Sequence, residues 1–287
     1  MKNDERRTTN LQYTNCNICG NDKTSLIAVQ NDYRFVKCRS CRLVYMNPRP
    51  SADELKSIYD TYHQRNGKDE GDWEEMMKDN FRQVSEMLVK KFPSGGRLLD
   101  IGCGYGHFIR IMEELHWHAE GIDPSAHTAD QARKAGRTVM HTTIDDVVIP
   151  ERTYEAVTMF YVLEHVTDPL KTLRKVFRLL VSGGLVVIRI PHTTPLVRFL
   201  SVFNITNNLY DAPFHLYDFS PSTVTRILEQ AGFANITITP GEPTRPHLVP
   251  ERIVSLLSGY AAKLLYRISN DTMLLPGASK TIIASKP

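Results

Sequence analysis

The sequence predicts an α/β protein with a doubly wound, mostly parallel sheet of seven strands and a small metal-binding module at its N-terminus. Three observations support this prediction. From residue 97 onward, apolar runs typical of strands alternate with helical patterns, an arrangement that favours a parallel sheet covered on both faces. A glycine-rich turn follows the first of these strands. Four of the five cysteines form two close pairs near the N-terminus.

The two cysteine pairs predict a zinc ribbon in residues 1–50. Two C-x-x-C motifs with 18 residues between them have the spacing of a tetrahedral site, and two short apolar runs, at 25–29 and 33–37, predict strands between them. All four thiolates are expected to bind one Zn²⁺: Cys16, Cys19, Cys38 and Cys41. Such a site has no open ligand position, so its role should be structural. The alternative is four unligated thiols.

Residues 51–92 predict a helical cap. Ser51 and Glu54 have the spacing of a capping box, and the helix that they begin carries Ile58, Tyr59 and Tyr62. A second helix is expected over 72–91, where apolar residues recur at helical spacing.

The third predicted unit, residues 93–287, holds the seven strands. They are expected at 97–100, 119–123, 138–142, 154–160, 185–190, 235–239 and 280–284. Helices are expected after Pro124-Ser125, from Asp168 to Leu180 and from Ser220 to Gly232. Two insertions, near 192–219 and 243–275, are expected to cover a substrate. The apolar helical pattern at 251–268 predicts either a helix packed on the sheet or a peripheral contact with a membrane.

The glycine-rich turn, Asp100-Ile101-Gly102-Cys103-Gly104-Tyr105-Gly106, joins a strand to a helix and predicts a nucleotide-cofactor loop. Its first residue distinguishes between cofactors. Asp100 would repel a pyrophosphate, whereas it suits a cationic ligand. Asp123, at the end of the next strand, would accept hydrogen bonds from two ribose hydroxyls, and Asp145 follows the third strand where an adenine edge would lie.

These motifs together resemble a class I S-adenosylmethionine-dependent methyltransferase, which implies a Rossmann-like fold. The turn resembles the first motif of that family, and Asp123 resembles the second. The segment 160–166, which begins with Phe160 and Tyr161, resembles the motif after the fourth strand. The resemblance implies that these two aromatic residues help bind the cofactor together with Asp100, Gly102, Gly104, Gly106, Asp123 and Asp145. The N-terminal cysteines and the segment 213–220 resemble a zinc-ribbon subgroup that is similar to ubiquinone-type O-methyltransferases.

The implied reaction transfers a methyl group to a small hydroxylated metabolite, sugar or lipid-linked intermediate. A hydroxyl acceptor needs a base, and His165 and His215 are the candidates because imidazole accepts protons near neutral pH. Glu164 is expected to hold a histidine or the substrate. Each of these residues has a structural alternative: orientation of the backbone or the cofactor for His165, packing for His215, and a solvated position at a helix start for Glu164.

Composition restricts the remaining alternatives. A formal charge of +3 is too small to imply nucleic acid as a partner, and the sequence contains no secretory signal or transmembrane run, so a cytoplasmic location is expected. One alternative function is a zinc ribbon that binds RNA or protein, with a degenerate cofactor domain. The ribbon cations considered for it are Arg34, Lys37, Arg39 and Arg42. An NAD-dependent enzyme is the other alternative, which the carboxylate of Asp100 disfavours.

Overall fold

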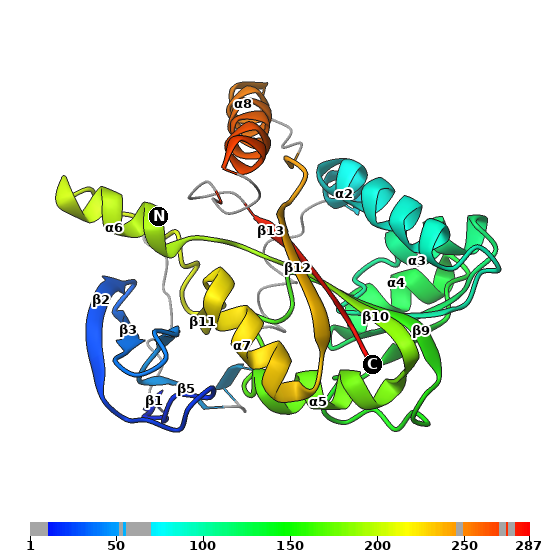
Figure 1. Cartoon of the computed structure of the whole chain (residues 1–287), viewed down its shortest axis with the longest axis horizontal. Coiled ribbons are helices and arrows are strands. Elements are labelled where there is room, and N and C mark those ends of the chain that lie inside the picture. Colours follow the sequence, from blue (N-terminus) through cyan, green and yellow to red (C-terminus); the bar gives the residue numbers. More distant parts are fainter. Residues whose placement is uncertain (1–10, 52–53, 56–69, 245–248, 270–273, 275–278) are drawn as a thin grey trace.

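A seven-stranded sheet forms the centre of the computed structural model, which describes residues 11–51, 54–55, 70–244, 249–269, 274 and 279–287 (Figure 1). In spatial order its strands are β12 (Ala234–Pro240), β13 (Lys280–Ser285), β10 (Leu180–Ile190), β9 (Tyr154–Phe160), β6 (Arg97–Ile101), β7 (His118–Asp123) and β8 (Val139–His141). β13 is antiparallel to both of its neighbours, and the pairs from β10 to β8 are parallel. The predicted sheet is confirmed.

Helices cover both faces of this sheet and enclose a separate core on each. One face carries α2 (Glu70–Lys91), α3 (His107–Glu114) and α4 (Ala126–Lys134), and its core includes Phe81 and Phe108. The other face carries α5 (Pro169–Leu179) and α7 (Pro221–Ala231), and its core includes Val176 and Ile227. This two-sided burial explains the nearly continuous apolar run of β10.

Local capping signals place three of the helix starts. The side chains of Ser125, Asp168 and Ser220 each accept a hydrogen bond from a backbone amide three residues later, at the starts of α4, α5 and α7. Such a cap satisfies one of the amide donors that have no partner at a helix N-terminus. The predicted starts of these helices are therefore confirmed.

The connection between α5 and β10 differs from the prediction. The helix was expected to continue through Leu180 and a turn to follow at 182–184, but α5 ends at Leu179 and β10 already begins at Leu180. Leu180 has extended backbone angles and pairs with Tyr154, and the register shifts between Leu180 and Leu185. Residues 182–184, which were expected to form a turn, therefore belong to the irregular first part of β10, where Gly183 has a φ of 78°.

A second sheet contains the strands of the N-terminal ribbon. Its order is β11 (Tyr217–Asp218), β4 (Val44–Met46), β3 (Tyr33–Cys38) and β2 (Thr24–Gln30). A further pair joins β1 (Leu11–Gln12) to β5 (Arg49–Pro50). The strand β11 comes from the segment that was expected to cover the substrate, and it pairs antiparallel with β4. The ribbon sheet is therefore completed by a segment some 170 residues later in the chain.

Side chains also join the ribbon to this later segment. The rings of Phe35 and Tyr210 stack with 4.2 Å between their centroids. Gln30 donates a hydrogen bond to the side chain of Asn207 at 2.7 Å and accepts one from the backbone of Tyr210 at 2.9 Å. Buried ribbon residues such as Leu43 belong to the same hydrophobic core as α5 and α7. The ribbon and the large sheet are thus packed as one body.

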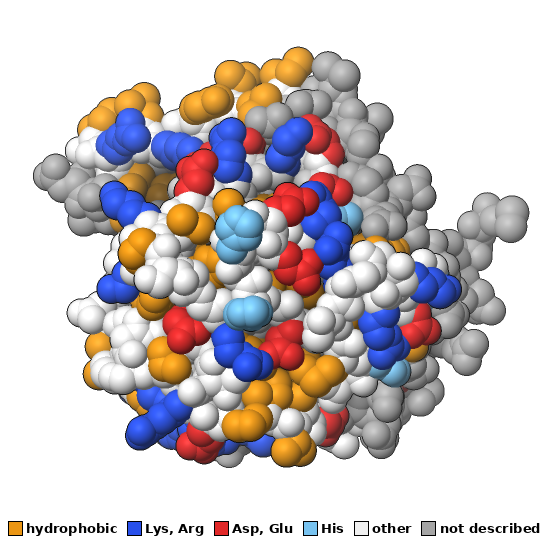
Figure 2. Space-filling model, turned by 90° about the vertical axis from the view of Figure 1, so that its right-hand side faces the viewer, with side chains coloured by type: hydrophobic (Ala, Val, Ile, Leu, Met, Phe, Trp, Pro, Cys, Tyr) orange, Lys and Arg blue, Asp and Glu red, His pale blue; other side chains and the backbone are white. Residues whose placement is uncertain are grey.

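Two further helices leave apolar side chains exposed. α6 (Thr194–Val202) follows β10, and α8 (Val249–Ile268) lies apart from the other helices at the top of Figure 1. The exposed apolar residues of α8 recur at helical spacing: Ile253, Leu257, Tyr260, Leu264 and Ile268. Figure 2 shows hydrophobic side chains along this upper edge. Membrane contact through this helix stays a prediction, and no described helix is long and apolar enough to span a bilayer.

Part of the predicted helical cap lies outside the described residues. Ser51 accepts a hydrogen bond from the backbone of Glu54 at 3.3 Å, as expected for a helix start. Ile58, Tyr59 and Tyr62 belong to the stretch that the structure does not describe.

Candidate active site and metal centre

The glycine-rich turn forms a backbone cradle at the carboxyl end of β6. Gly102, Gly104 and Gly106 all have positive φ angles, which L side chains rarely adopt. A Cβ on Gly102 would lie 2.5 Å from a methyl carbon of Val162, so that position has no room for a side chain. A Cβ on Gly104 would meet no atom within 4 Å and would project into open space. The cradle is therefore open above Gly104, where a ligand can approach the backbone.

Asp123 connects this cradle to the end of β7. One carboxylate oxygen accepts a hydrogen bond from the backbone of Gly104 at 2.8 Å. The other accepts from the backbone of Ser125 at 2.9 Å and from the hydroxyl of Thr128 at 2.8 Å. Three of roughly four acceptor positions of the carboxylate are thus used within the protein. Asp123, which the sequence predicts to bind the ribose, therefore also holds the turn in shape. About one lone pair of its carboxylate remains for a ribose hydroxyl.

Asp100 is a buried carboxyl without a cationic partner among the described side chains. It is 3% exposed and accepts a hydrogen bond from the hydroxyl of Thr158 at 2.6 Å. Burial, together with the nearby charge of Asp123, raises the pKa of Asp100 to about 7, although the hydrogen bond from Thr158 acts in the opposite direction. A cation bound beside Asp100 would reverse part of this shift, since it favours the ionised carboxylate. The site therefore suits a positively charged ligand.

The other predicted cofactor residues lie in less open surroundings. The carboxylate of Asp145 lies 3.6 Å from the ammonium group of Lys171 on α5. The ring of Phe160 packs in the core under α2, where Phe81 contacts it edge to face. Tyr161, with a φ of 57°, exchanges a hydrogen bond with Ser279 at 2.7 Å and accepts one from Arg189 at 2.9 Å. Ligand contacts by these residues stay predictions.

The three predicted catalytic side chains are brought together. Each of Glu164, His165 and His215 offers an atom that could bind a metal, and these atoms lie within 4.8 Å of one another. The two imidazole rings meet edge to face with 4.7 Å between centroids. His165 Nδ1 donates a hydrogen bond to the carbonyl oxygen of Phe214 at 2.9 Å, because that oxygen can only accept. In the neutral ring, Nε2 of His165 is then the basic nitrogen.

Burial shifts the ionisation of this group. It lowers the pKa of His215 to about 4, so its imidazole is neutral near pH 7. It raises the pKa of Glu164 to about 8, and Glu164 is completely buried with no hydrogen bond to either carboxylate oxygen. Two imidazoles and one carboxylate can move a proton, and they are also a donor set that divalent transition metals accept.

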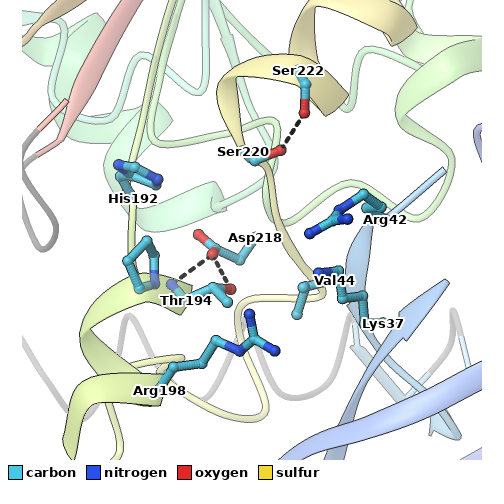
Figure 3. Close-up of a pocket in the computed structure, with 10 residues that line it drawn as sticks. Lys37, Arg42, Val44, His192, Thr194, Arg198, Asp218, Ser220 and Ser222 are labelled. Atoms are coloured by element: carbon cyan, nitrogen blue, oxygen red, sulfur yellow. Dashed lines mark hydrogen bonds between the residues drawn. The ribbon is translucent and has the colours of Figure 1, made fainter. Parts of the chain in front are cut away.

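Three polar residues behind this group are not among the site residues predicted from the sequence. Lys280 is 1% exposed, donates a hydrogen bond to the carbonyl of Pro191 at 2.6 Å, and has its pKa lowered to about 8 by burial. Asp218 accepts hydrogen bonds from the residues that begin α6, and His192 lies close by (Figure 3). The charges of Lys280 and Asp218 affect the pKa of both Glu164 and His192. Backbone hydrogen bonds from residues 216 and 217 to the carbonyl oxygen of Glu164 place Asp218 close to this group.

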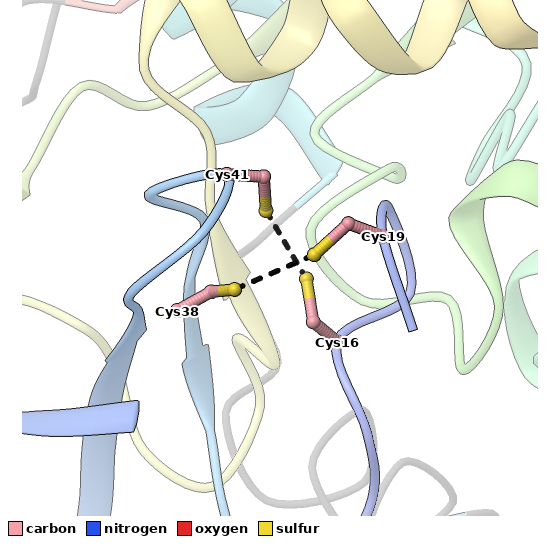
Figure 4. A group of neighbouring side chains, drawn as sticks. All are labelled: Cys16, Cys19, Cys38 and Cys41. Atoms are coloured by element: carbon pink, nitrogen blue, oxygen red, sulfur yellow. Dashed lines mark hydrogen bonds between the residues drawn. The ribbon is translucent and has the colours of Figure 1, made fainter. Parts of the chain in front are cut away.

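The four N-terminal cysteines converge on one point, from two separate loops (Figure 4). The Sγ atoms of Cys16 and Cys41 are 3.2 Å apart, and those of Cys19 and Cys38 are 3.5 Å apart. In a tetrahedral zinc site with bonds of about 2.3 Å, the sulfur atoms lie about 3.8 Å apart. None of the four is in a disulfide. The cluster therefore has the donor atoms and nearly the spacing of a four-thiolate zinc site.

The strand order, the single antiparallel strand β13 and the glycine cradle between β6 and α3 define a Rossmann-like methyltransferase fold. A family model described as a methyltransferase domain matches residues 73–238, which is more than half of the chain. The chain belongs to this methyltransferase-domain family.

Curated relatives carry related names. The chain is 30% identical to a ubiquinone biosynthesis O-methyltransferase of Dinoroseobacter shibae, over 48% of this chain and 60% of that protein. It is 25% identical to a probable S-adenosylmethionine-dependent methyltransferase of Mycolicibacterium smegmatis, over 49% of this chain and 52% of that protein. The match thus spans little more than half the length of these relatives.

The fold is also similar to that of solved structures. A possible histamine N-methyltransferase of Thermotoga maritima matches with a TM-score of 0.53 and 18% identity, over 80% of this chain and 99% of that one. A putative methyltransferase of Haloferax volcanii was solved in complex with the Trm112 methyltransferase activator. It matches with a TM-score of 0.55 and 15% identity, over 80% of this chain and 97% of that one. At such identities the likeness concerns the fold alone.

Proposed function

We propose that this protein transfers a methyl group from S-adenosylmethionine to the hydroxyl of a small metabolite, sugar or lipid-linked acceptor. The observation that carries the proposal is the buried carboxyl of Asp100 beside the open cradle at Gly104. A carboxyl with a raised pKa and no cationic partner among the described residues is suited to a ligand that brings its own positive charge. Membership of the methyltransferase-domain family and the name of the Mycolicibacterium smegmatis relative support the same donor.

Residues of the cradle would hold this donor. Asp100 would face its positive charge, the open backbone at Gly104 would allow close approach, and the remaining acceptor position of Asp123 would take a ribose hydroxyl. When bound, S-adenosylmethionine supplies an activated methyl group on a positively charged sulfur. The protein therefore has mainly to align the acceptor and to exclude water.

His165 is the proposed base for the acceptor hydroxyl. Its Nδ1 proton is held by the carbonyl of Phe214, so Nε2 receives the proton that the hydroxyl loses. Glu164, with a ligand atom within 4.8 Å of His165, would stabilise the imidazolium that forms, because that positive charge favours the ionised form of the carboxyl. His215 stays neutral and orients the ring of His165 by its edge-to-face contact.

The four-cysteine cluster is proposed to bind a structural Zn²⁺. All four ligands come from the protein, so the ion would have no open position for substrate or water. Its contribution would be to hold together the two loops that carry the cysteines, and with them the strands β3 and β4.

Calorimetric titration of the full chain with S-adenosylmethionine and, separately, with NAD tests the donor. We expect only S-adenosylmethionine to bind. Asp123→Ala should weaken this binding by ~1–3 kcal/mol, because a charge-assisted hydrogen bond and the brace of the cradle are lost. Asp130→Ala, which removes an exposed acid of α4, is the matched control and should change nothing. Binding of NAD alone, or equal losses in the two variants, would contradict the proposal.

The base is tested on an acceptor found by incubating cell metabolites with methyl-labelled S-adenosylmethionine and detecting products by mass spectrometry. His165→Asn should lower kcat by about 100-fold or more, the usual contribution of a general base, with an unchanged affinity for S-adenosylmethionine. It should also remove the acidic limb of the pH–rate profile. His118→Asn, at an exposed position on β7, is the control. An unaltered pH–rate profile in His165→Asn would rule out His165 as the base.

A further inference from the structure

A cavity of about 280 Å³ lies between the ribbon and the large domain, and we name it the seam pocket. Its wall includes Lys37 and Arg42 from the ribbon, Arg198 from α6, and Ser222 from the first turn of α7. Its volume is near the lower end of small-molecule sites, which begin at about 300 Å³. Figure 3 shows the guanidinium groups of Arg42 and Arg198 approaching this space from opposite sides.

The seam pocket gathers positive charge without neutralising it. Among the residues that the structure describes, Lys37, Arg42 and Arg198 have no carboxylate within ion-pair distance. The amino end of α7 adds the positive end of a helix dipole, and α7 is an 11-residue helix. Three cations and a helix N-terminus around one cavity favour an anionic ligand.

The acidic residue of the pocket is already satisfied. Asp218 accepts hydrogen bonds from the backbone of Thr193 at 3.1 Å, and from both the backbone, at 2.8 Å, and the hydroxyl of Thr194. The buried ammonium group of Lys280 balances its charge from behind. Asp218 therefore orders the start of α6, and the cations Lys37, Arg42 and Arg198 outnumber it in the pocket.

An unpartnered buried side chain also points to a ligand. His192 lines the seam pocket, is 9% exposed, and its Nδ1 has no hydrogen-bond partner in the described part of the chain. Leaving a buried polar atom unpaired is costly, so such an atom calls for an explanation, of which a bound ligand is one. Hydrogen bonds connect this pocket to the Glu164 group: Asp218 accepts from the backbone of Thr193, directly after His192, and residues 216 and 217 donate to the carbonyl oxygen of Glu164. A ligand in the seam pocket would lie next to the proposed methyl-transfer site.

We propose that the seam pocket binds a phosphate ester of the methyl acceptor, so that the acceptor is a phosphorylated small molecule and the ribbon forms part of the substrate site. This inference rests on the proposed function, because it takes the ligand of the pocket to be the methyl acceptor. Arg42 and Arg198 present the planar donors that match phosphate oxygens, Lys37 adds a point charge, and Ser222 and His192 add neutral hydrogen-bonding groups. Two of the four ribbon cations considered for RNA or protein binding, Lys37 and Arg42, then have a role in this pocket.

Calorimetric titration of the zinc-loaded full chain with pyrophosphate tests the pocket, in the presence and absence of saturating S-adenosylmethionine. We expect pyrophosphate to bind, and Arg42→Gln and Arg198→Gln each to weaken it by about tenfold. Arg34→Gln, which removes an exposed ribbon cation outside the pocket, is the matched control. Arg198 lies on α6, so its variant remains informative even if Arg42→Gln disturbs the ribbon. No binding by the wild type, or equal affinities in Arg198→Gln and Arg34→Gln, would overturn the proposal.

Two further arms separate the possible outcomes. A hexose 1-phosphate should bind more tightly than inorganic phosphate and compete with pyrophosphate, whereas the unphosphorylated hexose should not compete. If the hexose 1-phosphate binds no better than inorganic phosphate, the pocket holds a free anion and the assignment to an acceptor is wrong. Binding of S-adenosylmethionine is measured in the same samples. If it fails while pyrophosphate binds, the proposed function is wrong and the anion site stands.

Discussion

Behind the two histidines, buried charge is concentrated in Glu164, Lys280 and Asp218. Among the described residues, no group donates a well-formed hydrogen bond to the carboxylate of Glu164. Its own backbone and the charge of Lys280 favour the ionised form, and burial outweighs both. A carboxylic acid in such surroundings stays protonated at pH values well above its ordinary pKa. The folded protein therefore binds a proton at Glu164 that the unfolded chain would release, and stability becomes dependent on pH.

Thermal unfolding from pH 5 to pH 9 measures this dependence. The folded pKa of Glu164 is raised from 4.5 to about 8, so its contribution to stability is complete below about pH 4.5 and is lost as the pH rises through 8. Glu164→Gln does not titrate, and its melting temperature should rise relative to the wild type as the pH increases. Glu151→Gln, at an exposed position, should show a constant difference from the wild type. A constant difference in Glu164→Gln as well would mean that this carboxyl is not buried as described.

Several residues of the candidate site could be proposed from the sequence because their signals are local. Asp100, Gly104 and Asp123 are recognisable from the turn and the ends of two strands. Glu164 and His165 are neighbours in the chain, but nothing local places His215 beside them. That juxtaposition depends on backbone hydrogen bonds from residues 216 and 217 to the carbonyl oxygen of Glu164, at 2.8 Å and 3.2 Å.

Among the elements, helices and long strands were predictable and the short pairings were not. Caps such as Asp168 and Ser220 act over three residues, so the sequence shows them directly. The strand β11 has two residues and no periodicity, and its partner β4 is far away in the chain. The pairing is decided by tertiary packing, including the stack of Phe35 on Tyr210, which only the folded structure shows.

The ribbon is the element in which a metal should matter most. Removal of zinc by a chelator should speed hydrogen exchange in residues 16–46, because the four thiolates then lose the ion that holds them together and repel one another. Exchange should speed equally in residues 207–218, which share a sheet and side-chain contacts with the ribbon. Mass spectrometry of peptic peptides measures both, with β6 and β7 expected to remain protected.

A matched pair of cysteine variants completes this test. Cys38→Ala should lose bound zinc and reproduce the faster exchange, while Cys103→Ala, also at a buried cysteine, should keep the metal. Unchanged exchange in 207–218 after zinc loss would show that the two segments are independent. Zinc retained by Cys38→Ala would show that this thiolate is not a ligand.

At the scale of the whole molecule, one hydrophobic core runs from the ribbon through the far face of the large sheet. Ribbon residues such as Phe35 and Leu43 belong to the same cluster as Leu216 and Ile227. The predicted division into ribbon, cap and large domain describes the order of the sequence. The folded chain instead places the seam pocket where the first and third of these units meet, and no local pattern in either unit could reveal it.

The two-residue strand β11 has a practical consequence for fragments of this protein. A truncated chain that begins after residue 50 would leave one edge of Tyr217–Asp218 without its hydrogen-bonded neighbour and would expose the apolar surface beneath Leu216. Such a fragment is expected to aggregate or to bind another strand in place of the missing one. Swapping the ribbon between related proteins would likewise require the short strand to be exchanged along with it.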